Sequence, residues 1–99
     1  MELFKINVIE QKEFLDKIYE EFSEDDAHRV KLLEKTTNHD VKALEYFLKE
    51  KFDENERLKE LKEYIHFTCT SEDINNLAYG LMIKDAISSV ILPKLQALL

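Results

Sequence analysis

The 99-residue sequence has very few of the residues that form tight turns or covalent cross-links. It holds one glycine and one proline, whereas average proteins contain about 7% and about 5% of these residues. A fold with many tight turns is therefore excluded, as is a glycine-rich loop that cradles nucleotide phosphates. The single cysteine excludes a disulfide framework and a site built from several thiolates, and it is typical of a reducing compartment.

Long apolar runs and an excess of positive charge are also missing. No uncharged stretch of about 18 residues is present to span a bilayer, and the N-terminus does not resemble a signal peptide. The chain has 14 Lys and Arg residues against 21 Asp and Glu residues, which gives a formal net charge of −7. This balance argues against nucleic acid as a partner, because neutralising phosphates needs clustered cations. We therefore expect a small cytoplasmic protein with no membrane or nucleic-acid partner.

What the sequence does contain is apolar residues at helical spacing, which predicts an all-α fold. Short helices are expected over residues 10–22, from Ser23 to about Lys35, over residues 41–52 and around residues 58–65. Ser23 and Asp40 are the expected N-caps, because their side chains can accept hydrogen bonds from unpaired backbone N–H groups. In the third helix, the residues expected to face a core are Val41, Leu44, Phe47 and Leu48.

A long final helix is expected from residue 72 to the end of the chain, after an irregular or extended stretch at residues 65–70. Ser71 is its expected N-cap, and Pro93 is expected to kink it. Its apolar residues point to nearly every side, which is typical of a helix buried inside something larger. We therefore expect either a fragment of a longer protein or a protomer that buries this helix against other subunits.

The first candidate site is the polar run Thr36-Thr37-Asn38-His39-Asp40. Its hydroxyls, amide and imidazole could bind an oxyanion or position a hydroxyl group, and histidine titrates near neutral pH. A simpler interpretation is that Asn38 and Asp40 only cap a helix, with His39 half-exposed beside them. The residues alone leave both interpretations open.

The second candidate site is the run from Thr70 to Asn76, at the start of the long helix. A helix N-terminus carries a partial positive charge, and the hydroxyls of Thr70 and Ser71 would help it to bind a carboxylate or a phosphate. The alternative is again a cap followed by acidic residues. Glu72 and Asp73 would repel an anion unless their side chains point away from it.

Other candidates for chemistry are weaker. His66, His39 and an acidic residue could suggest a metal site, but the spacing of known metal motifs is absent, so no metal is expected. Cys69 has no basic neighbour in the sequence, and we expect a buried, inert thiol. No catalytic triad can be argued from the spacing of serine, histidine and acidic residues.

Two stretches of the sequence resemble the bacterial-type adenylosuccinate lyases. Residues 34–49, EKTTNHDVKALEYFLK, resemble the first characteristic block of that family. Residues 65–76, IHFTCTSEDINN, resemble the second block, at the expected separation. The likeness extends over about residues 14–99, and two long blocks in the right order are a specific signal.

The resemblance implies an all-helical fold of the fumarase/aspartase superfamily, whose members are homotetramers built around a central bundle of long helices. These enzymes cleave adenylosuccinate to AMP and fumarate, and they cleave the related succinylaminoimidazole carboxamide ribotide in purine biosynthesis. They use no metal and no organic cofactor. By this resemblance, residues 1–69 would be part of the N-terminal helical domain and residues 70–99 the first helix of the central bundle.

The resemblance also implies roles for particular residues. Asn38, His39 and Asp40 match the family's substrate-contacting Asn-His-Asp, in which the histidine helps to bind and orient the substrate. Thr70 and Ser71 match a Thr-Ser pair that hydrogen-bonds the anionic end of the substrate. His66 matches a histidine near the site.

The blocks that supply the catalytic acid and base of the family would lie beyond Leu99, and the family's N-terminal Arg-Tyr motif is absent. Eliminating fumarate requires both an acid and a base. The resemblance therefore implies a chain that binds substrate, contains no catalytic residue and is inactive alone. The alternative, from another class, is a non-catalytic module whose residues 72–99 self-associate or bind a partner helix.

Overall fold

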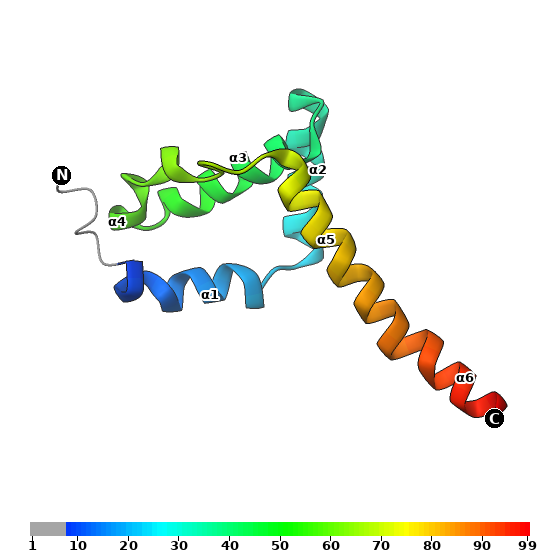
Figure 1. The fold of residues 1–99 in the computed structure, drawn as a ribbon. Coiled ribbons are helices and arrows are strands. Elements are labelled where there is room, and N and C mark those ends of the chain that lie inside the picture. The colour runs from blue at the N-terminus through cyan, green and yellow to red at the C-terminus, as the bar shows by residue number, and fades with distance from the viewer. Residues whose placement is uncertain (1–7) are drawn as a thin grey trace. The chain divides into compact units, whose positions relative to one another are not determined.

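The computed structural model describes residues 8–99, and every regular element in that range is helical (Figure 1). The prediction of an all-α fold with short helices followed by one long helix is therefore confirmed for the described residues. The chain divides into two units between Phe67 and Thr68. In residues 8–99, no helix is both long enough and apolar enough to cross a lipid bilayer.

The first unit consists of short helices joined by tight connections. In chain order these are η2 (Val8–Gln11, a 3-10 helix), α1 (Lys12–Glu20), α2 (Glu24–Thr37), α3 (Asp40–Asp53), α4 (Glu56–Lys59) and η3 (Lys62–Tyr64, a 3-10 helix). The expected helices are all present, although the first begins with a 3-10 turn. The short helix expected around residues 58–65 is divided between α4 and η3.

The ends of α2 are fixed by its own sequence. The Ser23 hydroxyl accepts a hydrogen bond from the backbone N–H of Asp26 at 3.2 Å, and the Asp26 carboxylate accepts one from the backbone N–H of Ser23 at 3.1 Å. This reciprocal capping box confirms Ser23 as the N-cap. At the other end, Asn38 adopts a left-handed conformation with φ 51°, which asparagine tolerates better than most residues. The helix therefore ends at Thr37 rather than near Lys35.

The N-cap of α3 differs from the prediction. His39, not Asp40, has the extended cap conformation, and its Nδ1 accepts a hydrogen bond from the backbone N–H of Lys42 at 3.2 Å. Asp40 is already the first helical residue, and its carboxylate accepts from the N–H of Val41 at 2.7 Å. Asp40 was predicted as the N-cap, which is wrong by one residue. His39 can take this place because a neutral imidazole nitrogen accepts a hydrogen bond as a carboxylate does.

The small core of the first unit lies between α2, α3 and α4. Its buried apolar residues are Val41, Ala43, Phe47 and Leu58. The Phe47 ring meets the Phe22 ring edge-on, with centroids 5.8 Å apart. Val41 and Phe47 confirm the expected inward positions, whereas Leu44 and Leu48 are only half-buried. Ala43 and the charged residue Glu45 are buried in addition, and neither was expected.

The second unit is one continuous helical segment, made of α5 (Ser71–Ala86), the π-helical turn η4 (Ile87–Ile91) and α6 (Leu92–Leu98) (Figure 1). Its N-cap is Thr70 and not Ser71. Thr70 forms a capping box with Asp73, and Ser71 is the first helical residue. The prediction of Ser71 was wrong because serine and threonine can both cap a helix, and residue type does not decide between neighbours.

A kink was expected at Pro93, and the structure has a π-helical turn directly before it, at Ile87–Ile91. Proline has no backbone N–H and its ring clashes with the carbonyl group four residues earlier, and π turns relieve such mismatches. None of the residues of α5, η4 and α6 is buried. The apolar residues of this segment that are more than two-fifths exposed are Leu77, Tyr79, Leu81, Met82, Ile83, Ile87, Val90, Ile91, Leu92, Leu95, Leu98 and Leu99.

Candidate functional site

The Asn38-His39-Asp40 segment forms the junction between α2 and α3. Thr37 braces this junction: its hydroxyl donates a hydrogen bond to the His39 carbonyl oxygen at 3.0 Å, and it accepts one from the His39 backbone N–H at 3.4 Å. The side chain of His39 is about half-exposed, at 48%. The backbone of the segment is therefore held firmly, while the imidazole stays accessible to solvent.

The cap bond determines the chemistry of the His39 ring. Nδ1 lies 3.4 Å from Oδ1 of Asp40, but it also accepts a hydrogen bond from the Lys42 N–H at 3.2 Å. Because a backbone N–H that points at Nδ1 requires a lone pair there, the neutral ring carries its proton on Nε2. A ring in this tautomer presents an N–H donor on the side away from the helix. Such a donor is suited to an anionic or carbonyl oxygen of a ligand. The two interpretations of this segment are thus compatible, since His39 caps α3 and can still bind an anion.

Asn38 borders an open groove on the surface of the first unit. The other residues that line this groove are Lys31, Glu34 and Lys35, which belong to α2. Lys31 and Glu34 pair with each other at 2.6 Å. The groove therefore has polar walls and a net positive charge of one, which suits a polar or anionic ligand better than an apolar one.

Thr70 and Ser71 lie at the start of α5, in the second unit. The Thr70 hydroxyl accepts a hydrogen bond from the Asp73 N–H at 3.3 Å, and the Asp73 carboxylate accepts one from the Thr70 N–H at 2.8 Å. Asp73 thus supplies a carboxylate of its own to this helix end. A hydroxyl can donate and accept at the same time, so the Thr70 O–H retains the capacity to donate to a ligand oxygen.

His66 lies in the first unit, near the middle of α3. Its Nδ1 is 3.5 Å from Oε2 of Glu45. Its Nε2 is buried and has no hydrogen-bond partner in the part of the chain that the structure describes. His66 and Thr68 both have positive φ angles, 68° and 65°, and the stretch around them consists of turns. The prediction of an irregular segment at residues 65–70 is therefore confirmed, but Cys69 is exposed rather than buried.

Glu45 is the residue that the sequence analysis missed. Its carboxylate is buried, with 7% of the side chain exposed, and it contacts Lys42 Nζ at 2.9 Å and Lys49 Nζ at 3.2 Å. Burial by itself raises the pKa of the Glu45 carboxyl, but the hydrogen bonds from the two lysines outweigh it, so this pKa lies below its ordinary value. The sequence does contain a signal for this arrangement. Lys42 stands three residues before Glu45 and Lys49 four residues after it, so both lie on the same face of a helix.

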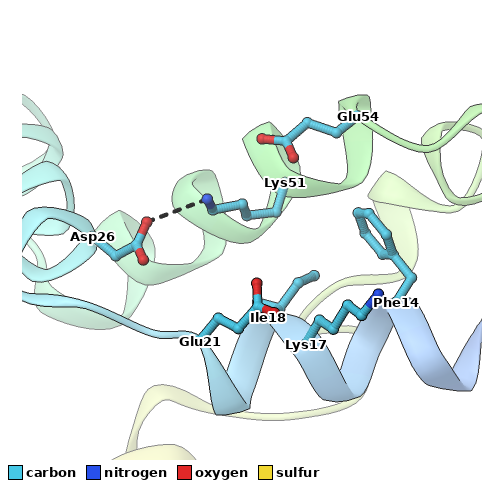
Figure 2. Close-up of a pocket in the computed structure, with 7 residues that line it drawn as sticks. All are labelled: Phe14, Lys17, Ile18, Glu21, Asp26, Lys51 and Glu54. Atoms are coloured by element: carbon cyan, nitrogen blue, oxygen red, sulfur yellow. Dashed lines mark ion pairs between the residues drawn. The ribbon is translucent and has the colours of Figure 1, made fainter.

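A half-open pocket of the first unit has none of these residues in its lining (Figure 2). It has a volume of about 180 Å³ and is lined by Phe14, Lys17, Ile18, Glu21, Asp26, Lys51 and Glu54. Figure 2 shows the ion pair between Lys51 Nζ and an Asp26 oxygen, 3.2 Å apart, at one side of it. The backbone N–H of Ser23 and the Lys51 ammonium lower the pKa of the Asp26 carboxyl. This ion pair joins α2 to α3, which is a structural role.

The structure places the predicted residues in three places. Asn38, His39 and Asp40 lie together at the α2–α3 junction, His66 lies against Glu45 in the same unit, and Thr70 and Ser71 begin the helix of the second unit. In the described part of the chain, no group of three His, Cys, Asp or Glu side chains is arranged to hold a metal ion.

Comparison with known proteins gives consistent matches to one family. A family model described as lyase matches residues 5–99. The chain is 58% identical over 94 residues to an adenylosuccinate lyase of Buchnera aphidicola from Acyrthosiphon pisum, covering 93% of this chain and 21% of that protein. It is 61% identical over 80 residues to the adenylosuccinate lyase of Escherichia coli K12, covering 81% of this chain and 18% of that protein.

A third relative has the same name and a similar extent. The adenylosuccinate lyase of Legionella pneumophila strain Corby is 60% identical over 82 residues, covering 83% of this chain and 18% of the relative. The resemblance found in residues 34–49 and 65–76 is therefore confirmed. The chain spans about a fifth of the length of the curated relatives it matches.

Proposed function

Because the chain belongs to the lyase family, we propose that it contributes to an adenylosuccinate lyase. The proposed reaction eliminates fumarate from adenylosuccinate to give AMP, and from succinylaminoimidazole carboxamide ribotide, in purine biosynthesis in the cytoplasm. The observation that carries the proposal is the 53–61% identity to adenylosuccinate lyases, because the aligned residues include both polar segments.

The proposed role of this chain is to bind substrate. His39 supports it best, because the cap bond to Lys42 leaves the proton of the neutral ring on Nε2. We assign His39 to donate this hydrogen bond to an oxygen of the substrate and thereby orient it. Asn38 and Asp40 are adjacent on the same rigid junction and complete this part of the proposed site.

Thr70 and Ser71 are the second part of the proposed site. They begin a helix of 16 residues, and the partial positive charge at a helix N-terminus favours an anion. Their hydroxyl groups are proposed to donate to a carboxylate of the succinyl moiety. His66 is assigned a place near the substrate because its unpartnered Nε2 is the only buried polar side-chain atom of the described residues without a hydrogen bond.

The catalytic acid and base are proposed to come from other segments of the enzyme. Elimination requires a base to take a proton from carbon and an acid to protonate the departing nitrogen. The formal net charge of −7 also means that further cations must come from elsewhere to bind a substrate with several negative charges. We therefore expect no lyase activity from the 99-residue chain alone, and no metal or organic cofactor in the reaction.

The proposed architecture places residues 1–69 in an N-terminal helical domain and residues 70–99 in the first helix of a central bundle. The exposure of Leu77, Leu81 and Leu95, each at least half-exposed, supports this assignment. Burying a large apolar side chain stabilises an assembly by about 1.5–3 kcal/mol. We propose that other helices of a homotetramer cover this segment.

A chimera tests the proposed function. The 80 matched residues of the Escherichia coli enzyme are replaced by the corresponding residues of this chain, and fumarate release is measured. We expect an active chimera in which His39→Ala or Ser71→Ala lowers kcat/KM about 10- to 100-fold, because each loses one to two hydrogen bonds to a charged group. His28→Ala, at an exposed histidine of α2, is the matched control and should leave kcat/KM unchanged.

The alternative function is a helical interaction module, which the exposed apolar residues of α5 and α6 also favour. In a module, the association of the 99-residue chain would be its whole function. Sedimentation would then show the same self-association for the parent, His39→Ala and Ser71→Ala. An active chimera that loses turnover in those two variants, but not in His28→Ala, contradicts this alternative.

A further inference from the structure

The buried carboxylate of Glu45 connects two distant parts of the first unit. Glu45 lies on α3, and His66 lies 21 residues later in the chain, beyond η3. Oε2 of Glu45 lies 3.5 Å from Nδ1 of His66. The side chains of both residues are largely enclosed, with 7% of Glu45 and 23% of His66 exposed. This contact is therefore well shielded from solvent.

The charge on Glu45 determines which nitrogen of His66 carries the proton. Lys42 and Lys49 hold the Glu45 carboxyl ionised, and its pKa is lowered accordingly. A bare Nδ1 lone pair facing this anion would be repelled, whereas an N–H is attracted. Nδ1 therefore carries the proton, and the neutral ring has its lone pair on Nε2.

The remaining nitrogen of His66 has no hydrogen-bond partner among the described residues. Within residues 8–99, Nε2 is buried and makes no hydrogen bond, and leaving a buried polar atom without a hydrogen bond is unfavourable. The backbone is strained as well, because His66 and Thr68 both adopt left-handed φ angles that are unfavourable for residues other than glycine. Strained backbone and unpartnered polar atoms of this kind gather at ligand sites.

We propose that Glu45 is a positioning residue for His66, which fixes the ring with Nδ1–H toward the carboxylate and Nε2 toward bound ligand. In this state Nε2 accepts a hydrogen bond from a hydroxyl or amino group of the ligand. Lys42 and Lys49 support the arrangement by keeping Glu45 charged. The tautomer follows from the contacts within this unit, while the ligand-facing role rests on the proposed function, which places His66 near the substrate.

The tautomer can be measured directly in the 99-residue chain. Long-range proton–nitrogen NMR correlations distinguish the two neutral tautomers of each histidine, at about pH 8, above the ordinary histidine pKa of about 6.5. The His66→Gln spectrum assigns the signals. We expect His66 to be an Nδ1–H tautomer in the parent, and to shift toward the Nε2–H tautomer in Glu45→Ala. A parent His66 with its proton on Nε2 overturns the proposal.

A matched variant separates this effect from a general loss of charge on α3. Glu50 lies on the same helix, and its carboxylate pairs with Arg29 of α2 and not with His66. Glu50→Ala should therefore leave the His66 tautomer unchanged. Equal shifts in Glu45→Ala and Glu50→Ala would also overturn the proposal, because they would show that no specific contact orients the ring.

A double-mutant cycle in the active chimera tests the ligand-facing role. Glu45→Gln should lower kcat/KM about 10-fold in the parent chimera and have little further effect beside His66→Gln, because its influence passes through the ring. A purely structural role of Glu45 would give the same loss of kcat/KM in the parent chimera and in the His66→Gln chimera.

The two proposals can fail separately. Loss of activity in the unmutated chimera would count against the proposed function alone, whereas an unchanged tautomer in Glu45→Ala would count against the positioning role alone.

Discussion

Thr70 and Asp73 bind each other's backbone across the first turn of α5. The Thr70 hydroxyl accepts from the Asp73 N–H at 3.3 Å, and the Asp73 carboxylate accepts from the Thr70 N–H at 2.8 Å. Two N–H groups that lack intrahelical partners are satisfied in this way. The same arrangement, with Ser23 and Asp26, begins α2. Side chains of the chain itself therefore satisfy these backbone groups at the start of both helices.

The first prediction separates Thr70 from its neighbour. Thr70→Ala should destabilise the start of α5 by about 0.5–2 kcal/mol, because it removes the cap acceptor. Ser71→Ala changes a residue that is already helical, and it should alter stability by less than about 0.5 kcal/mol. Amide hydrogen exchange at residues 73–76 measures the difference. A larger loss of protection in Ser71→Ala than in Thr70→Ala would contradict the assigned cap.

The second prediction concerns acid stability. The pKa of Glu45 is lower in the folded chain than its ordinary value of 4.5, so the folded state favours the ionised form. The resulting stability is present above the ordinary value and is lost as the pH falls through the folded value. We expect the free energy of unfolding to decrease on acidification below about pH 4.5, and to decrease less steeply in Glu45→Gln.

The lysines provide the control for this effect. Lys49→Gln removes one of the two ammonium groups that contact the Glu45 carboxylate and should give a slope between those of the parent and Glu45→Gln. Chemical denaturation at several pH values measures the three slopes. Parallel curves for all three proteins would show that Glu45 is not the group responsible.

Local features of the fold could be predicted because they depend on neighbouring residues. The Ser23 cap and the helical stretches follow from side-chain type and apolar spacing alone. The caps at His39 and Thr70 were each assigned one residue too late, because a polar neighbour of suitable type stood beside the true cap. In such runs the residue types predict that a helix begins there. They do not predict which of two adjacent residues has the extended backbone of the N-cap.

Tertiary features could not be predicted in the same way. The burial of Glu45 was not predicted, although Lys42 and Lys49 stabilise its carboxylate in that position. Its contact with His66 joins residues far apart in the sequence, which no local pattern reveals. Cys69 was expected to be a buried, inert thiol because it has no basic neighbour in the sequence, yet it is exposed. The substrate-binding roles of His39, Thr70 and Ser71 stay predictions.

The third prediction tests the small core. Leu58 is 1% exposed, whereas Leu32 on α2 is 53% exposed. Leu58→Ala should destabilise the first unit by about 2–5 kcal/mol, because it leaves a cavity. Leu32→Ala deletes the same atoms at the surface and should change stability by less than about 0.5 kcal/mol. Denaturant unfolding measures both, and equal losses would mean that α4 does not pack as described.

The fourth prediction concerns the π-helical turn before Pro93. Proline cannot donate the hydrogen bond that an α-helix would send to the Ser89 carbonyl, and its ring clashes there. Ser88 and Ser89 also contribute, because their hydroxyls donate to the Lys84 and Asp85 carbonyl groups. We assign the turn chiefly to Pro93, because replacing proline by alanine inside a helix gains about 3 kcal/mol.

Pro93→Ala should therefore convert residues 87–91 to regular α-helix and slow the hydrogen exchange of their amides. Removing a π turn also rotates α6 about its axis relative to α5, by about 100° for one residue, so Leu95 and Leu98 would face a different direction. Ser89→Ala removes one hydroxyl bond and keeps the proline, and it should leave the π turn in place. If Ser89→Ala straightened the helix and Pro93→Ala did not, the serine hydroxyls and not the ring would be the cause. The two outcomes are distinguishable by amide exchange and by carbonyl carbon chemical shifts along residues 84–93.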